Sequence, residues 1–303
     1  MSREHISDKP VTQPSSDDDV DFMNLDETDF ASMSRPEQIR HFEVEGYVIL
    51  PEILTPALIA KVKEEMSVAE MGHTDYSEAQ TRSVEQPQWT SRTAAELIGY
   101  PPMIEFLTDL LGPDIVFTRG FYQRSLPGCP GISMHTDGQP HGSNLFGYEG
   151  SCPRLLRVLY YLDDLTAERA PFRLIPRSHL SFHADASPYV RYKSHPEEIT
   201  LTCKAGSAVL IPSLMIHGSH PNRTNDIREL LHFGYRPAWA GPMAPIEDDW
   251  SPEQVATMPD VAKPLFQSLN TTGFKWDQPN KPTGMKTEAP GLNPSRWGDR
   301  TTT

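Results

Sequence analysis

Residues 115–136 read IVFTRGFYQRSLPGCPGISMHT, two strand-like runs separated by a turn rich in Pro and Gly. β-Branched and aromatic side chains favour extended backbone, whereas Pro and Gly favour turns. Short strands separated by frequent turn residues are typical of a sandwich or barrel rather than of alternating strands and helices. We therefore predict a mainly β fold with flanking helices. Further strand-like runs follow at 155–162, 172–175, 199–202, 208–211, 215–217 and 230–235.

Helices are predicted on the N-terminal side of this β region. Ser34 is a good N-cap, and Gly46 is expected to end the first helix. Residues 72–93 lack hydrophobic periodicity, so we expect a long loop there, of the kind that in an enzyme often covers the active site. The other elements predicted in this part are a strand at 47–50 and helices that start at Thr55 and cover 103–111.

Composition divides the chain into three parts. Residues 1–33 are acidic and poor in large apolar side chains, so we expect them to be disordered. Residues 34–240 carry the strand-like runs and form the predicted domain. Residues 241–303 are rich in Pro, and we expect an irregular extension there rather than a second domain.

The charge and cysteine content exclude several classes of partner. The 303 residues carry a formal net charge of -14, which disfavours nucleic acid and anionic membrane surfaces. We see no apolar stretch that would span a bilayer and no export signal. The cysteines Cys129, Cys152 and Cys203 are odd in number and form no CxxC pair, which argues against a disulfide framework. We therefore expect a cytoplasmic protein, and the sequence leaves its oligomeric state open.

The candidate chemistry starts at His135-Thr136-Asp137. Side chains alternate along a strand, so His135 and Asp137 are expected on the same face. Two imidazoles and one carboxylate make up the facial triad that holds non-haem Fe(II) and leaves other positions open. His217, from a distant strand, would complete this set. Arg228 could then bind the carboxylate of an organic-acid cosubstrate.

Two of these positions have rivals in the sequence. His220 competes with His217 for the third ligand, and we prefer His217 because it follows an apolar run whereas His220 precedes a proline. Arg223 and Arg236 compete with Arg228 for the carboxylate. Arg223 lies in a polar turn and Arg236 adjoins a proline, so Arg228 is favoured.

Other residues are candidates to line the site. Arg157, Tyr160 and Tyr161 lie on one predicted strand, but both of its faces are apolar, so the sequence does not say which side chains point inward. The glycine-rich segment Gly138–Ser151 is expected to form a loop at the mouth of the pocket. His179 is expected to serve the structure of a turn rather than to bind metal.

The ordered motifs resemble those of the phytanoyl-CoA dioxygenase family of 2-oxoglutarate-dependent oxygenases. The similarity extends over roughly residues 39–237, and Arg177 replaces the glycine that is usual in one of the turns. It implies a double-stranded β-helix core, of the jelly-roll or cupin-like kind. The segments that carry the resemblance are Phe42–Pro51, Met134–Gly138, Tyr161–Asp164, Ile175–His179 and His217–Ser219, with Asn222 and Arg228.

The resemblance also implies roles for individual residues. His135, Asp137 and His217 would bind Fe(II), and Arg228 would hold the far carboxylate of 2-oxoglutarate. The reaction would use O2 and release succinate and CO2 while a small-molecule substrate is hydroxylated. The carboxylate of Asp137 favours hydroxylation, because halogenases of this type leave that ligand position open.

Two alternative functions are weighed against this one. The chain could be a jelly-roll binding or sensor protein that has kept the metal and 2-oxoglutarate without catalysis. It could also be a zinc-dependent hydrolase or isomerase that uses the same ligands, although Arg228 would then have no purpose. The substrate is not identified by the sequence, which shows no basic groove for the phosphates of a coenzyme A thioester.

Overall fold

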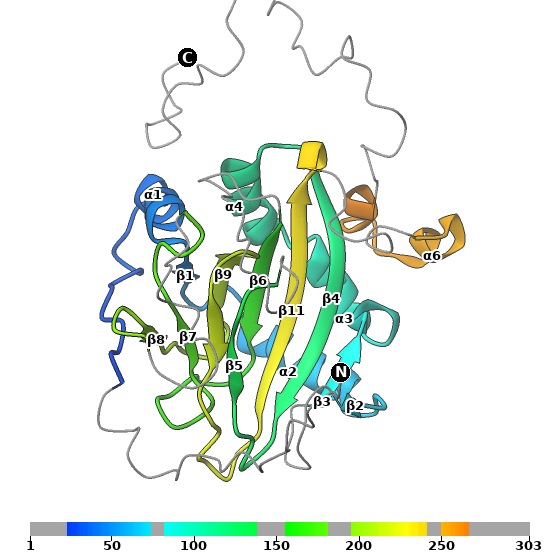
Figure 1. The fold of residues 1–303 in the computed structure, drawn as a ribbon. Helices are drawn as coiled ribbons and strands as arrows, with labels where there is room; N and C mark the ends of the chain where they lie inside the picture. Colours follow the sequence, from blue (N-terminus) through cyan, green and yellow to red (C-terminus); the bar gives the residue numbers. More distant parts are fainter. Residues whose placement is uncertain (1–22, 74–81, 138–154, 181–194, 241–249, 267–303) are drawn as a thin grey trace, which may run out of the picture.

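A computed structural model describes residues 23–73, 82–137, 155–180, 195–240 and 250–266. Two antiparallel sheets form the body (Figure 1). The large sheet has the strand order β1-β9-β6-β11-β4-β3-β2, and the small sheet has the order β5-β10-β7-β8. The large sheet consists of β1 (Val48–Leu50), β2 (Gly72–His73), β3 (Arg82–Glu85), β4 (Ile115–Ser125), β6 (Leu156–Tyr161), β9 (Ala208–Pro212) and β11 (Arg228–Pro237). The small sheet consists of β5 (Ile132–His135), β7 (Phe172–Leu174), β8 (Ile199–Leu201) and β10 (His217–Ser219).

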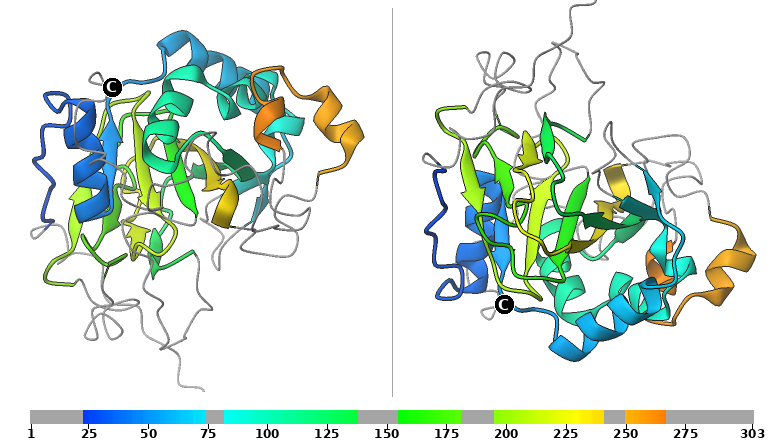
Figure 2. Two further views of the ribbon diagram at one scale, coloured as in Figure 1. Left: turned by 90° about the horizontal axis from the view of Figure 1, so that it is seen from above. Right: turned by 90° about the horizontal axis from the view of Figure 1, so that it is seen from below.

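The chain crosses repeatedly between the two sheets. Of the eight strands from β4 to β11, the large sheet contains β4, β6, β9 and β11, and the small sheet contains β5, β7, β8 and β10. Eight antiparallel strands wound in this way form a jelly roll. The predicted fold class, a double-stranded β-helix with flanking helices, is confirmed. The sheets face each other and leave their inner faces for a site (Figure 2).

Helices cover the outer side of the large sheet and one of its edges (Figure 2). The first of them, α1, begins after Ser34, whose backbone amide and hydroxyl both donate to Glu37. It ends at Gly46 in the left-handed conformation, as expected. The helices are α1 (Arg35–Glu45), α2 (Pro56–Met66), α3 (Arg92–Ile98), α4 (Pro101–Leu111) and α6 (Pro252–Thr257), with short 3-10 turns at Pro87–Trp89, Ala238–Ala240 and Lys263–Phe266.

The segment 72–93 corrects the sequence-based expectation of one long loop. It contains β2, β3, a 3-10 turn and the start of α3, and only 74–81 lies outside the described residues. β3 pairs with β4, with Val84 opposite Tyr122. The sequence of β3 is short and polar, so its own pattern does not mark it as a strand. Main-chain pairing with the edge of the sheet is what makes it one.

Both tails are partly packed against the body. The amide of Asp26 donates to the carbonyl of Thr200, and the Phe30 side chain is buried. The prediction that residues 1–33 are disordered is therefore wrong for residues 23–33, whereas residues 1–22 lie outside the described part of the chain. In the C-terminal extension, Trp250 and Phe266 pack on Phe117, with ring centroids 5.8 and 5.2 Å away. This contact anchors the described part of the extension.

Three strand boundaries differ from prediction in ways that matter for the site. β4 continues to Ser125, and β11 already starts at Arg228, directly opposite Ser125. β10 begins at His217 rather than ending there.

The predicted loop Gly138–Ser151 lies outside the described residues. Arg177 has a φ of 64°, the left-handed conformation that favours the glycine it replaces.

Two absences can be stated for the described residues. None of their helices has the length and apolar character needed to cross a bilayer. Neither Cys129 nor Cys203 forms a disulfide bond, and Cys152 lies outside this part of the chain.

Candidate metal and cosubstrate site

Neighbouring strands of the small sheet bring His135, Asp137 and His217 together. His135 ends β5, His217 begins β10, and the two residues are paired in register. One potential ligand atom from each of the three residues lies within 4.8 Å of the others. The Nε2 atom of His135 is 3.4 Å from Oδ1 of Asp137, and that of His217 is 3.9 Å from Oδ2. The three residues expected from the sequence to form a site are therefore adjacent in the fold.

Backbone contacts orient both imidazoles in the same way. Nδ1 of His135 lies 2.8 Å from the carbonyl of Ser133, and Nδ1 of His217 lies 2.8 Å from the carbonyl of Met215. A carbonyl oxygen accepts a hydrogen bond, so each Nδ1 carries a hydrogen, and Nε2 is left as the ring nitrogen that can bind a metal. Histidine ligands of metals are commonly oriented by such a bond.

The strands that carry the imidazoles are anchored from behind. Met134 and Ile216 precede the two histidines and point to the opposite face, where they form a small buried cluster with Ile175. The ring of Phe172 stacks on His217 with centroids 5.5 Å apart. The rigid packing on both sides favours a fixed site over a flexible one.

The charges around the site suit a divalent cation. Burial and then the nearby His135 lower the pKa of His217 to about 4, so this imidazole is neutral at pH 7. Burial opposes the ionisation of Asp137, but Arg157 and then His217 hold the pKa of its carboxyl well below the usual range. Burial would also lower the pKa of His135, but the hydrogen bond and charge of Asp137 outweigh it and raise that pKa.

Arg157 of β6 reaches the site from the large sheet. Its Nε donates to Oδ2 of Asp137 at 3.0 Å, and its side chain is buried. Tyr161, four residues further along the same strand, faces the same side, because Arg228 lies over its ring. Tyr160 points to the other face and packs against Phe233. The structure thus answers which of these side chains point inward.

Arg228 is the first residue of β11, and its side chain is a buried cation. It is 3% exposed, and its Nη2 donates to Oγ of Ser125 at 2.7 Å. Its guanidinium carbon is 5.7 Å from the centroid of the Tyr161 ring. Nε has no hydrogen-bond partner, and no carboxylate among the described residues forms an ion pair with Arg228. A buried arginine in this state fits an anionic ligand, such as the far carboxylate of a dicarboxylate.

The rival residues are placed differently. Nε2 of His220 lies 3.0 Å from Oγ1 of Thr200, and His220 is not among the three clustered ligand residues. Arg223 is exposed. Arg236 is fully buried, but its Nη1 donates to the carbonyl of Ala238 at 3.2 Å, beyond the opposite end of β11 from Arg228.

Ser125 and His232 were missed by sequence reasoning. Ser125 follows the predicted end of its strand, and His232 lies two residues from Leu230 in a run interpreted only as core. With the correct register, both share a face of the large sheet with Arg228. Burial and then the positive Arg157 lower the pKa of His232 to about 3, so it is neutral at pH 7.

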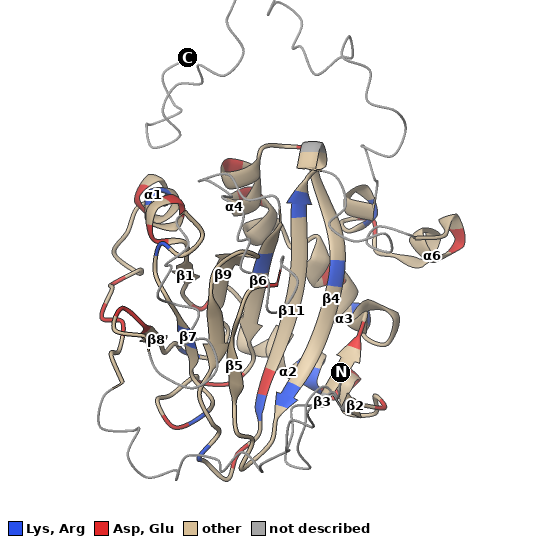
Figure 3. Cartoon of the chain, viewed as in Figure 1, with Lys and Arg blue, Asp and Glu red and all other residues tan. Residues whose placement is uncertain are grey.

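Basic side chains lie on the central strands of the large sheet. Figure 3 shows them on β4, β6 and β11, in a protein whose overall charge is strongly negative. Two of these, Arg157 and Arg228, are the buried cations described above. The inner face therefore differs in charge from the protein as a whole.

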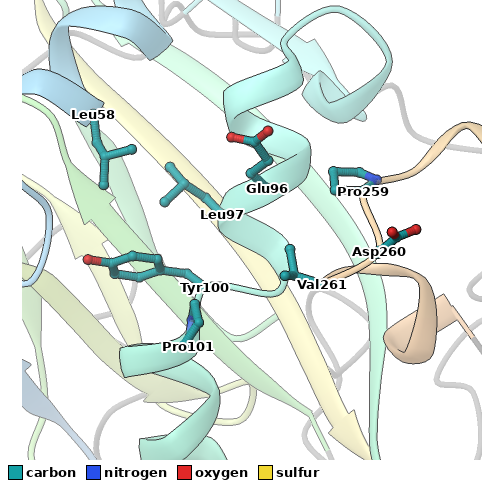
Figure 4. Close-up of a pocket in the computed structure, with 8 residues that line it drawn as sticks. All are labelled: Leu58, Glu96, Leu97, Tyr100, Pro101, Pro259, Asp260 and Val261. Carbon is teal, nitrogen blue, oxygen red and sulfur yellow. The ribbon is translucent and has the colours of Figure 1, made fainter.

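A separate hollow lies on the outer side of the molecule (Figure 4). It separates α3 from the C-terminal segment and is lined by Leu97, Tyr100 and Val261, with the carboxylates of Glu96 and Asp260 at its edge. Its described lining includes no histidine or arginine. We interpret it as a space left where α3 and the C-terminal segment pack together.

The donor set fits the metal that the fold suggests. Two imidazole nitrogens and one carboxylate are a suitable set for Fe(II), and three protein ligands leave coordination positions for other molecules. The buried Arg228, which lacks a carboxylate partner among the described residues, suits a cosubstrate that carries a second carboxylate. The residues present therefore fit both groups.

Comparisons with known proteins identify relatives in sequence and in fold. The curated dioxygenase trt7 of Aspergillus terreus is 29% identical over 106 residues, which is 35% of each chain. The matched part thus spans about a third of that relative. The solved structure of HygX from Streptomyces hygroscopicus, with nickel, 2-oxoglutarate and hygromycin B bound, is 20% identical. It aligns with a TM-score of 0.57 over 68% of this chain and 88% of that one.

A second solved structure shows the same fold. The epimerase SnoN from nogalamycin biosynthesis, described as non-haem and α-ketoglutarate dependent, aligns with a TM-score of 0.56 and 17% identity over 67% of this chain and 83% of that one. The family model for phytanoyl-CoA dioxygenase matches residues 42–230. This match confirms the predicted family, and the two solved structures, each below 25% identity, show that the fold is shared. The chain belongs to the phytanoyl-CoA dioxygenase family.

Proposed function

We propose that this protein is an Fe(II)- and 2-oxoglutarate-dependent dioxygenase that hydroxylates a C–H bond of a small organic substrate and releases succinate and CO2. One observation carries the proposal. The ligand atoms of His135, Asp137 and His217 converge within 4.8 Å on the inner face of the small sheet, and the buried Arg228 faces inward from the large sheet.

Each residue has a defined task in this proposal. The two imidazoles and the carboxylate of Asp137 would hold iron, with Nε2 of each histidine as the donor atom. Arg228 and Ser125 would orient 2-oxoglutarate by binding its far carboxylate. Iron, when bound with 2-oxoglutarate and O2, supplies the oxidising chemistry, and the protein supplies binding and orientation. The carboxylate ligand supports hydroxylation rather than halogenation.

The zinc hydrolase alternative is less well supported. A metal-dependent hydrolase needs a general base near the metal. The carboxylate of Asp137 contacts both clustered imidazoles, and it already belongs to the ligand set. A hydrolase would also leave the buried Arg228 without a role. HygX was solved with hygromycin B bound and SnoN in complex with nogalamycin RO, which supports a small organic substrate here.

The test measures iron-dependent turnover directly. Protein purified without oxygen is loaded with Fe(II) and 2-oxoglutarate, then exposed to O2 with a panel of small organic substrates. We expect succinate formation that rises with a true substrate, and a product heavier by one oxygen in the mass spectrum. His135→Ala and Asp137→Ala should abolish both signals. Unchanged succinate formation in both variants would refute the proposal, and succinate without any oxidised product would favour the sensor alternative.

A further inference from the structure

We propose that Arg157 is a positioning residue that holds one carboxylate oxygen of Asp137 and so presents the other oxygen to the metal. The inference rests on the proposed function, because it concerns how the chain presents its iron ligands. Arg157 itself would touch neither the metal nor the substrate in this role.

The contact distinguishes the two oxygens of Asp137. Oδ2 accepts a hydrogen bond from Nε of Arg157 at 3.0 Å. Oδ1 lies 3.4 Å from Nε2 of His135 and is closer to an imidazole than Oδ2, which lies 3.9 Å from Nε2 of His217. The backbone of Asp137 is fixed as well, because its amide donates to the carbonyl of Ser213 at 2.8 Å. Main chain and side chain are thus both held before any metal arrives.

The absence of a side chain at Gly234 leaves room for the guanidinium of Arg157. Arg157 lies opposite Gly234 of β11, and a β-bulge follows Gly234 where β11 pairs with β4. A Cβ atom on Gly234 would lie 2.8 Å from Nη1 of Arg157 and 2.5 Å from Oγ1 of Thr118. Any side chain at position 234 would therefore displace the guanidinium or the threonine. Bulges often re-aim side chains next to active sites.

A second buried arginine in this fold is bound differently. Arg236 is fully buried on the same strand as Gly234, and its Nη1 donates to the backbone carbonyls of Pro237 and Ala238 at the end of the strand. Arg157 instead directs Nε at a predicted metal ligand, while its buried Nη1 has no hydrogen-bond partner. Arg157 thus leaves Nη1 without a hydrogen bond while its Nε holds the carboxylate of Asp137.

The geometry has a chemical consequence. A carboxylate with no second partner can turn both oxygens toward a metal and occupy an additional coordination position. Iron in this family needs its open positions for 2-oxoglutarate and O2. Partners that orient a ligating side chain typically change metal affinity by about 10- to 100-fold when they are removed. Arg157 would therefore influence both metal affinity and the room left for the cosubstrate.

The test uses Co(II) as the probe, because its visible absorption reports coordination number and binding together. Full-length Arg157→Met is expected to bind Co(II) about 10- to 100-fold more weakly than wild type. At saturating Co(II), its Kd for 2-oxoglutarate should rise about tenfold or more, with an altered spectrum. Arg157→Lys should recover part of both, and Gly234→Ala should shift both in the direction of Arg157→Met.

Two controls match these variants. Arg119→Met removes an arginine that lies opposite Gly234 but forms its ion pair with Glu85 rather than Asp137. Gly72→Ala adds a methyl group that meets nothing closer than 3.7 Å. Both should bind Co(II) as wild type does. Thermal unfolding confirms that each variant is folded.

The outcomes separate this inference from the proposed function. Wild-type Co(II) and 2-oxoglutarate affinities and spectra in folded Arg157→Met would overturn the positioning role. Wild-type behaviour of Gly234→Ala would overturn the proposed seat for the guanidinium. Failure of the wild-type protein itself to bind Co(II), or equal binding by His135→Ala, would instead refute the proposed function.

Discussion

Arg228→Met is expected to raise the Kd for 2-oxoglutarate by about 100-fold or more. The guanidinium is 3% exposed, is held by Ser125 and keeps Nε without a partner. A bound carboxylate would receive two charge-assisted hydrogen bonds from it, each with a net contribution of about 1.5–3 kcal/mol. Loss of both removes about 3–6 kcal/mol, and the lower figure corresponds to about 100-fold in Kd.

The assay is a titration of 2-oxoglutarate into protein loaded with a divalent metal that does not turn over, followed by calorimetry or visible absorption. Arg223→Met is the matched control, because Arg223 is exposed and its loss should leave the Kd unchanged. Ser125→Ala should have a smaller effect of about 1 kcal/mol, since it removes one neutral partner of the guanidinium. A wild-type Kd for 2-oxoglutarate in Arg228→Met would show that Arg228 does not bind the cosubstrate.

Stability distinguishes this loss from misfolding. Arg228 is a buried charge without a carboxylate ion-pair partner among the described residues, and replacing such a charge by an apolar side chain of similar size is often neutral or stabilising. Metal-free Arg228→Met should therefore unfold at a temperature equal to or above that of wild type. A large drop in unfolding temperature would mean that Arg228 serves the fold rather than the ligand.

Three further predictions concern the ligand set and the fold. His217→Ala should abolish succinate formation and Fe(II) binding, whereas His220→Ala should keep both; the reverse result would exchange the two roles. His217, with a pKa lowered by burial to about 4, stays neutral near pH 7, whereas His135 has a raised pKa and is protonated first as the pH falls. The Kd for Co(II) should therefore rise as the pH is lowered through the raised pKa of His135, by up to about tenfold per pH unit, and a Kd that does not depend on pH would contradict this. Gly46→Ala should lower the free energy of unfolding by about 2–4 kcal/mol, because φ is +85° and the added Cβ would collide with His179. Gly112→Ala, at a φ of +91° with nothing within 4 Å, should cost only about 1–2 kcal/mol in urea denaturation, and equal losses would refute the packing argument.

The small sheet illustrates why the ligand motif was readable. His135 and Asp137 are two residues apart at the end of a strand, and strand geometry alone places them on one face. The third ligand was harder to identify, because it comes from a strand that is distant in sequence. Registration of β10 against β5 is what sets His217 opposite His135 and leaves His220 beyond the end of the strand.

Local chemistry by itself determined much of this protein. The caps at Ser34 and Gly46 define α1, turn residues separate the strands, and alternation orients the His-x-Asp pair. Each of these depends on neighbours within a few residues, so a single sequence contains the information.

Only the tertiary structure decided the rest. The pairing of β4 with β11 sets Arg228 beside Ser125, and the pairing of β6 with β11 sets Arg157 over Gly234. β3 became a strand because an unpaired edge of β4 was available to it. Pairing between distant segments depends on register and on the packing of the two sheets, and no local pattern encodes these. For that reason the three residues proposed to bind metal could be predicted from the sequence, whereas the contact of Arg157 with Asp137 could not.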